Sequence, residues 1–209
     1  MLAPAKPVVL TAAMRPATAL LRDGPQNLLD AVTVAREVGA RGVMAVLGGS
    51  VHAAQDVRKV HSYQVDAFGS GEAGLIARLE EGRLRCFRDW PSGTALGLAL
   101  LQPDAAAWPK VEIVTSHAGA SGLLVQAAVA AGAQGLIVAG TGNGSVHHQL
   151  ESALLAAQAG GVRVWRCTRC LDGPVQLKPG DALESAGTLT PVKARIELLL
   201  QLMVDSGSP

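Results

Sequence analysis

Few side chains in this sequence are suited to chemistry, and Lys59 is the most prominent of them. It lies in the polar stretch "QDVRKVHSYQVDAFGSGEAG", residues 55–74, between an acid and a histidine. A lysine amine held beside carboxylates and hydroxyls can pass a proton to or from a nucleophile once burial brings its pKa toward the working pH. Taken alone, a loop lysine is more often simply solvated. The stretch therefore supplies a candidate for proton transfer that needs a nucleophile to accompany it.

Other combinations of reactive residues carry weaker signals. Ser50, His52 and Asp56 are the residue types of an acyl-transfer triad, but no G-x-S-x-G nucleophile elbow is present and closeness in sequence does not make a triad. The five histidines show no ligand spacing with a carboxylate, so no metal site is predicted. Cys167 and Cys170 have C-x-x-C spacing without a second pair, which favours free thiols and leaves a redox pair as the alternative.

Two loops lie where α/β proteins can bind ligands. "AGTGNGSV", residues 139–146, lies between a predicted strand and a predicted helix, where backbone N–H groups can cradle a phosphate. Its spacing is G-x-G-x-G rather than the dinucleotide G-x-G-x-x-G, so a tight structural turn is favoured over a nucleotide site. Arg15, Arg22 and Asp23 follow the carboxyl end of a strand, where open α/β sheets bind ligands. Ligand binding and simple solvation both remain open for that loop.

Composition excludes several classes of partner. Lys and Arg number 18 against 17 Asp and Glu, with no basic cluster, so neither nucleic acid nor an anionic membrane is expected as a partner. Aromatic residues make up only 3%, too few for a base-stacking surface. The sequence holds no run of 18 apolar residues, and its first ten residues lack the apolar core of a signal peptide. A cytoplasmic protein acting on a small neutral molecule is expected.

Short apolar runs alternate with amphipathic segments along the chain, a pattern typical of an α/β protein. In the first half we predict strands at residues 7–11 and 42–47, joined by a helix into a parallel βαβ unit. That helix has Pro25 in its first turn and Gly39 just past its end. One face of the helix is apolar and is expected to pack on the sheet. Its members are Leu28, Leu29, Val32, Ala35 and Val38.

A hairpin is predicted next, over residues 75–88, with its turn at residues 80–82. Residues 91–109 are small, polar and rich in proline, which indicates a connection, although "TALGLALL" within it has the composition of an added strand. The β/α rhythm then resumes. We predict strands at 111–115, 135–139 and 162–166 and helices at 121–131, 146–159 and 191–204.

The predicted fold is an incomplete N-terminal doubly wound domain, residues 1–90, followed by a smaller C-terminal α/β domain with a parallel sheet, residues 110–209. Residues 91–109 connect them. The first domain is called incomplete because a buried parallel strand needs neighbours on both sides, and only about six residues precede the strand at 7–11. The rest of its sheet is expected upstream or on another polypeptide. Residues 1–209 alone are then expected to self-associate through the exposed strand edge.

Four separated motifs resemble one enzyme family. "AMRPATALLRDGPQNLLDAV", "DVRKVHSYQVDAFGSGEAGLIARLEEGRL", "GLIVAGTGNG" and "AGTLTPVKARIELLL" are similar, in the same order and with compatible gaps, to the later two-thirds of bacterial-type L-asparaginases of the threonine-nucleophile family. The "AMRP…DGPQNL" form resembles the type II, asparaginase/glutaminase-like, branch. The resemblance spans nearly the whole chain.

This resemblance implies a two-domain homo-oligomer, dimer or tetramer, that hydrolyses L-asparagine to L-aspartate and ammonia without metal or cofactor. A threonine hydroxyl attacks the side-chain amide in that family, and a second threonine, an aspartate and a lysine handle protons. Lys59 matches that lysine. The family's "TGGTI"-like and "TDT"-like threonine motifs do not occur in residues 1–209, and they are expected upstream of Met1. Gly119 matches the position where type II relatives often contribute an asparagine to the neighbouring subunit's pocket, and no substrate-binding residue is assigned.

Two hypotheses for the whole chain follow. The first is an amidohydrolase whose catalytic threonines come from outside residues 1–209. The second is a catalytically inactive asparaginase-like fragment that serves as a binding or assembly protein. A nucleotide-binding protein relying on Gly140 to Gly144 is a more distant third.

Overall fold

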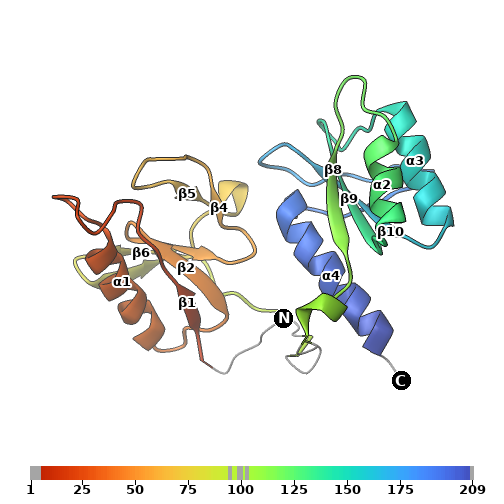
Figure 1. Cartoon of the computed structure of the whole chain (residues 1–209). Helices are drawn as coiled ribbons and strands as arrows, with labels where there is room; N and C mark the ends of the chain where they lie inside the picture. Colours follow the sequence, from red (N-terminus) through yellow and green to blue (C-terminus); the bar gives the residue numbers. More distant parts are fainter. Residues whose placement is uncertain (1–5, 94–95, 98–100, 102–103, 208–209) are drawn as a thin grey trace. The chain divides into compact units, whose positions relative to one another are not determined.

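The computed structural model describes residues 6–93, 96–97, 101 and 104–207. The chain divides into two compact units (Figure 1). The boundary between them along the sequence falls after Gly97, within the predicted connection. The possible strand in "TALGLALL" lies largely outside the described residues. No helix in the described part of the chain is both long and apolar enough to cross a bilayer.

The first unit is a mixed sheet with one helix against it. The sheet has five strands in the order β1-β2-β3-β6-β7, of which only β1 and β2 run parallel. Helix α1 connects those two strands, so the predicted parallel βαβ unit is confirmed. The elements are β1 (Val8–Leu10), α1 (Gly24–Arg36), β2 (Val43–Leu47), β3 (Ser50–Ala53), β4 (Arg58–Lys59), β5 (Phe68–Gly69), the 3-10 turn η1 (Gly71–Ala73), β6 (Ala77–Glu80) and β7 (Arg83–Cys86).

Two hairpins shape the antiparallel part of this sheet. The predicted β6–β7 hairpin is confirmed, and it turns through Glu81 and Gly82, both with positive φ. Strand β3 was not predicted. It pairs with β2 around Gly48 and Gly49, with φ of 55° and 70°, which is the backbone that a two-residue hairpin turn requires. The Gly-Gly pair was the sequence signal for this hairpin.

The predicted packing face of α1 is wrong. Leu28 and Leu29 are each 60% exposed, whereas the buried residues are Asn27, Asp30, Ala31 and Val34. Asn27 explains this orientation: its amide donates to Ala12 O at 2.8 Å, and its carbonyl accepts from Gly48 N at 3.0 Å. These polar bonds tie the first turn of α1 to the loop after β1 and to the β2–β3 turn. Ala31 and Val34, one and two turns later, therefore face the sheet.

The second unit contains the predicted parallel sheet. Four parallel strands lie in the order β11-β10-β9-β8, and all the predicted strands and helices of this half are present. Strand β11 alone was not predicted. The elements are the 3-10 turn η3 (Ala105–Ala107), β8 (Val111–Thr115), α2 (Leu123–Ala130), β9 (Gly135–Gly140), α3 (His148–Ala159), β10 (Arg163–Thr168), β11 (Glu184–Ser185) and α4 (Pro191–Gly207).

Helices cover both faces of this sheet, as Figure 1 shows with α2 and α3 on one side and α4 on the other. Strand β9 is buried along its whole length, and successive side chains of a strand point to opposite faces. Leu136 and Val138 therefore pack in the core under α2 and α3, while Ile137 packs with Leu198 of α4. The unit is therefore a three-layer sandwich of helices, sheet and helix, with an apolar core on each side of the sheet.

Strand β1 is an edge strand, and among the described residues it pairs only with β2. Its last residue, Leu10, is 55% exposed. An unpaired strand edge with an exposed leucine is a template for pairing with another chain. We expect the 209-residue chain to self-associate through this edge.

A Leu10→Lys variant tests this expectation, because a lysine on the edge repels a second copy. We expect the monomer fraction in analytical ultracentrifugation to rise relative to the unchanged chain. Leu177→Lys is the control, since Leu177 is 54% exposed in the second unit and lies outside any strand. A monomeric, cooperatively melting parent chain would contradict the expectation.

Candidate functional site

Lys59 lies on β4, in a small two-stranded ribbon separate from the main sheet of the first unit. It pairs with Phe68 of β5, and its Nζ is 5.9 Å from the centroid of the Phe68 ring. That distance and geometry are those of a weak cation–π contact. The side chain is exposed, and among the described residues an aromatic ring rather than a carboxylate is its neighbour. The role of Lys59 in proton transfer stays a prediction.

The candidate triad residues have different partners. His52 is 1% exposed, and its Nδ1 is 2.8 Å from Ser70 Oγ, a residue 18 positions later that directly follows β5. Asp56 forms an ion pair with Arg88, 32 positions later, at 2.6 Å. The structure therefore does not assemble Ser50, His52 and Asp56 into a triad. Ser70 and Arg88 carried no local sequence signal, because these contacts depend on how the hairpins fold back.

His52 is held in its neutral form. Burial, together with the positive charges of Arg78 and Arg88, lowers the pKa of His52 to about 4. Its Nε2 is buried and has no hydrogen-bond partner among the described residues. Protonation would place a further positive charge in a dry site beside two guanidinium groups, which is unfavourable. His52 is therefore suited to tying chain segments together rather than to accepting protons near neutral pH.

The glycine-rich turn after β9 is closed by its own backbone. Thr141 and Ser145 exchange two backbone hydrogen bonds, of 3.0 and 2.8 Å. A Cβ added to Gly140 would lie 2.5 Å from the carbonyl carbon of Gly144, so no other residue fits without movement of the turn. The Asn143 side chain bonds the backbone of Gln176 through both its nitrogen and its oxygen, each at 2.8 Å. These contacts, together with the positive φ of Gly142 (48°) and Gly144 (78°), account for the glycines without a phosphate ligand.

The arginine-containing loop after β1 lines a pocket with Ala13, Ala17, Gly24 and Pro25. Both arginines bond within the loop: Arg15 donates to Leu21 O at 2.7 Å, and Arg22 donates to Ala17 O at 3.4 Å. Asp23 accepts from the backbone N–H of Met14 and Arg15, both at 2.9 Å. The loop is thus organised by its own polar groups, and both guanidinium groups have protein partners.

The cysteines are free thiols. Cys167 is buried in the core beneath α4, where burial raises the pKa of its thiol to about 12, while Cys170 is exposed. A thiol with so high a pKa is a poor nucleophile and a poor redox group. Within the described residues, no group of three His, Cys, Asp or Glu side chains is arranged to hold a metal ion.

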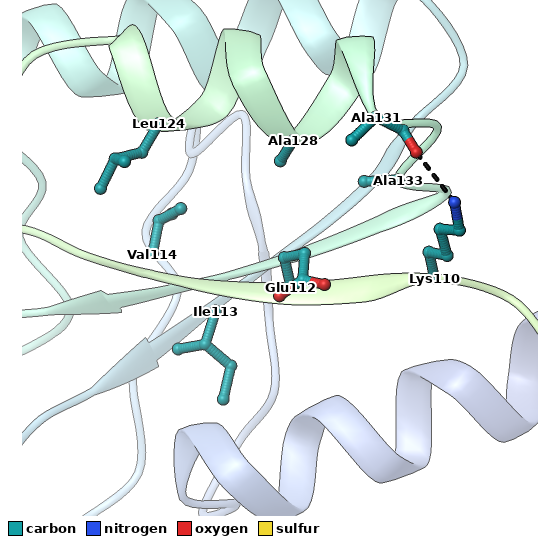
Figure 2. Close-up of a pocket in the computed structure, with 8 residues that line it drawn as sticks. All are labelled: Lys110, Glu112, Ile113, Val114, Leu124, Ala128, Ala131 and Ala133. Atoms are coloured by element: carbon teal, nitrogen blue, oxygen red, sulfur yellow. Dashed lines mark hydrogen bonds between the residues drawn. The ribbon is translucent and has the colours of Figure 1, made fainter.

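A further pocket lies at the open side of β8, beneath α2 (Figure 2). Its lining is mostly apolar, and at one end Lys110 Nζ donates to Ala131 O at 3.0 Å. The lining residues are Lys110, Glu112, Ile113, Val114, Leu124, Ala128, Ala131 and Ala133. With one lysine already bonded and one exposed glutamate, the pocket offers no constellation for nucleophilic catalysis.

The architecture defines a class: an α/β protein in which a mixed sheet with a projecting lysine ribbon precedes a parallel three-layer unit. Residues 1–92 match the family model described as asparaginase, N-terminal, and residues 110–208 match the glutaminase/asparaginase C-terminal domain. The chain belongs to the asparaginase family.

Individual relatives agree with this assignment. The chain is 35% identical to L-asparaginase 2 of Escherichia coli (strain K12) and 34% identical to L-asparaginase 2 of Bacillus subtilis (strain 168), over 94% of its own length in both cases. It spans 59% and 54% of those two proteins. The crystal structure of a probable cytoplasmic L-asparaginase from Campylobacter jejuni superposes with a TM-score of 0.87 at 33% identity, covering 94% of this chain and 66% of the other.

The buried His52 makes stability depend on pH. The unfolded chain takes up a proton below its ordinary pKa of 6.5, while the folded chain resists protonation until about 4, so stability present above pH 6.5 is lost as pH falls through this window. We expect a loss of roughly 3 kcal/mol between pH 7 and 4 from this group. Urea unfolding at several pH values measures this. The free energy of unfolding should depend less on pH in His52→Asn than in the parent.

The matched control for this measurement is His61→Asn, because His61 is an exposed histidine of the same unit. The pH dependence of the unfolding free energy is expected to be smaller in His52→Asn than in His61→Asn. Equal slopes in the His52 and His61 variants would show that His52 is not the group responsible.

The closed glycine turn predicts unequal costs for two alanine substitutions. Gly140→Ala forces a Cβ into the Gly144 backbone and should cost about 3 kcal/mol of unfolding free energy. Gly142→Ala meets no atom within 4 Å and should cost only about 1 kcal/mol, from its φ of 48°. Urea unfolding measures both. Tight binding of an adenine nucleotide by the parent chain, lost in Gly142→Ala, would instead favour the nucleotide-site alternative.

Proposed function

We propose that this protein acts in the hydrolysis of L-asparagine to L-aspartate and ammonia, as an amidohydrolase of the threonine-nucleophile type. Family membership along nearly the whole chain supports the reaction class, and similar proteins carry the name L-asparaginase. The observation that carries the proposal is the position of Lys59 within "DVRKVHS", on a ribbon that projects from the first unit. A lysine there is available to a reaction centre completed by further residues.

The proposed chemistry is acyl transfer. A threonine hydroxyl attacks the side-chain amide carbon of asparagine while the Thr-Lys-Asp relay, with Lys59 as its amine, removes the hydroxyl proton. The tetrahedral intermediate collapses as the C–N bond breaks, and a proton delivered to the nitrogen lets ammonia leave. Water then attacks the acyl ester, which releases L-aspartate and regenerates the hydroxyl. Each step moves protons and electron pairs only, so it requires no redox cofactor, and the resemblance to L-asparaginases implies that it uses no metal.

The attacking threonine is proposed to come from outside residues 1–209, because neither threonine motif of the family occurs within them. Residues 1–90 are then the later part of the N-terminal domain, residues 91–109 the connection and residues 110–209 the C-terminal domain. A cytoplasmic homo-oligomer, dimer or tetramer, is the proposed working form. The exposed edge of β1 offers a place where further strands can join the first sheet.

The test compares the chain in its native assembly with the chain alone. A tagged copy recovered from its source under mild conditions should release ammonia from L-asparagine, whereas the purified 209-residue chain should be at least about a hundredfold slower. Lys59→Met keeps much of the side-chain volume and removes the amine, so it should lower kcat of the assembly by roughly 10² to 10⁴.

Lys178→Met is the matched control, since Lys178 is an exposed lysine of the second unit, and it should retain activity. Unchanged turnover in Lys59→Met would refute the assignment of the amine. A fully active isolated chain would refute an external nucleophile.

The second candidate is an inactive asparaginase-like binding or assembly protein. The exposure of Lys59, with Phe68 as the neighbour of its ammonium, favours it. This candidate predicts that the native assembly either releases no ammonia or releases it equally well with Lys59→Met. The same assay therefore separates the two.

A further inference from the structure

The ribbon that carries Lys59 is too small to hold its own position. Strands β4 and β5 contain two residues each, and two further backbone bonds, from Val60 N and His61 N to Ala67 O at 2.8 and 3.3 Å, extend the ladder. An isolated two-stranded hairpin is marginal in water. The position of the Lys59 amine must therefore be set where the ribbon joins the main sheet.

Arg88 bonds the segments on both sides of the ribbon. Its Nη2 donates to Asp56 Oδ2 at 2.6 Å and to Gly74 O at 3.1 Å. Asp56 lies three residues before Lys59, in the turn whose backbone bonds return to Ala53 at the end of β3. Gly74 follows β5 and the η1 turn. One guanidinium group thus bridges the entry to the ribbon and the exit from it.

Arg88 itself is fixed to the main sheet. It comes two residues after β7, and its backbone N–H, like that of Phe87, donates to Ile76 O. The Arg88 and Asp56 side chains are 32% and 16% exposed, against 58% and 50% for the Arg85–Glu80 pair of the same unit. The more buried pair is less screened by water, and a charged hydrogen bond of this length is strong and directional.

Besides the Arg88–Asp56 pair, a second contact ties the segments around the ribbon to the main sheet. The buried His52–Ser70 bond connects β3 to the residue that follows β5. His52 is next to Ala53, to which the Asp56 turn bonds, and Ser70 and Gly74 both follow β5, so the two ties join the same segments and form one polar cluster. Neither tie reaches Lys59 directly, and both act on the backbone on either side of it.

We infer that Arg88, through Asp56 and Gly74, is a positioning residue that holds the β4–β5 ribbon and with it the amine of Lys59. The expected effect on turnover rests on the proposed function, whereas the expected effect on the position of the ribbon does not. Breaking the Arg88–Asp56 pair should leave the unit folded, let the ribbon move relative to the main sheet and slow a reaction that needs the amine in place.

The two phenylalanines of the chain, Phe68 and Phe87, provide a readout that does not depend on activity. Phe68 lies on the ribbon, and Phe87 stacks with Arg85, whose guanidinium carbon is 4.7 Å from its ring centroid. With 4-fluorophenylalanine incorporated, the chain gives two ¹⁹F signals, assigned through Phe87→Leu. Asp56→Ala should shift or broaden the Phe68 signal and leave the Phe87 signal in place. Arg85→Met, which breaks the exposed Arg85–Glu80 pair, should do the reverse.

The second readout is turnover by the native assembly. Asp56→Ala and Arg88→Met should each lower kcat about tenfold to a hundredfold with KM within about twofold, because a displaced amine impairs proton transfer more than binding. The double variant should lose no more than Arg88→Met alone, since Arg88→Met already removes the bonds to both Asp56 and Gly74. Arg85→Met should match the parent.

Each outcome is decisive for one of the two proposals. An unchanged Phe68 signal in folded Asp56→Ala overturns the positioning role, whatever the activity. If Arg88→Met fails to fold, Asp56→Ala alone decides. If the parent assembly and Lys59→Met are equally inactive, the proposed function fails while the ¹⁹F comparison still decides whether the pair holds the ribbon. A shifted Phe68 signal with an unchanged kcat overturns the catalytic consequence.

Discussion

A strand pair of two residues a side cannot fix a side chain in space, and the candidate site of this protein depends on that constraint. The contacts on either side of the Lys59 ribbon are the Arg88–Asp56 ion pair, the Arg88 bond to Gly74 and the buried His52–Ser70 bond. Each of them joins a turn beside the ribbon to β3 or to the residue two positions after β7. The β2–β3 and β6–β7 hairpins are therefore the elements that decide where the lysine lies.

The same polar cluster also sets the electrostatics near the ribbon. Burial, with the positive charges of Arg78 and Arg88, lowers the pKa of His52 and keeps its ring neutral, so the cluster contains one paired carboxylate, one neutral imidazole and one hydroxyl. Such groups are costly to bury unless their hydrogen bonds are made. Once made, those bonds restrict the geometry more than apolar packing would, because their direction as well as their length is specified. A small projecting element benefits most from this kind of support.

The second unit is built on a different principle. Its parallel strands are covered on both faces, and its stability comes from two apolar cores on either side of β9. The glycine turn after β9 is shaped by close backbone approach at Gly140 and by the bonds of Asn143 to Gln176. The glycine-rich loop of this unit is thus organised by its own contacts. The first unit has an open strand edge at β1 and an exposed apolar side on α1.

The sequence by itself determined the α/β class, the parallel βαβ unit, every helix and strand of the second half except β11, and the family, because strong apolar periodicity and long motifs are local properties of the chain. Only the tertiary structure decided which face of α1 is buried, since Asn27 orients that helix through bonds to Ala12 and Gly48. It also decided the partners of His52 and Asp56, which lie 18 and 32 residues away. Contacts between residues so far apart in the sequence form only when the hairpins fold back on one another, so no local sequence pattern predicts them.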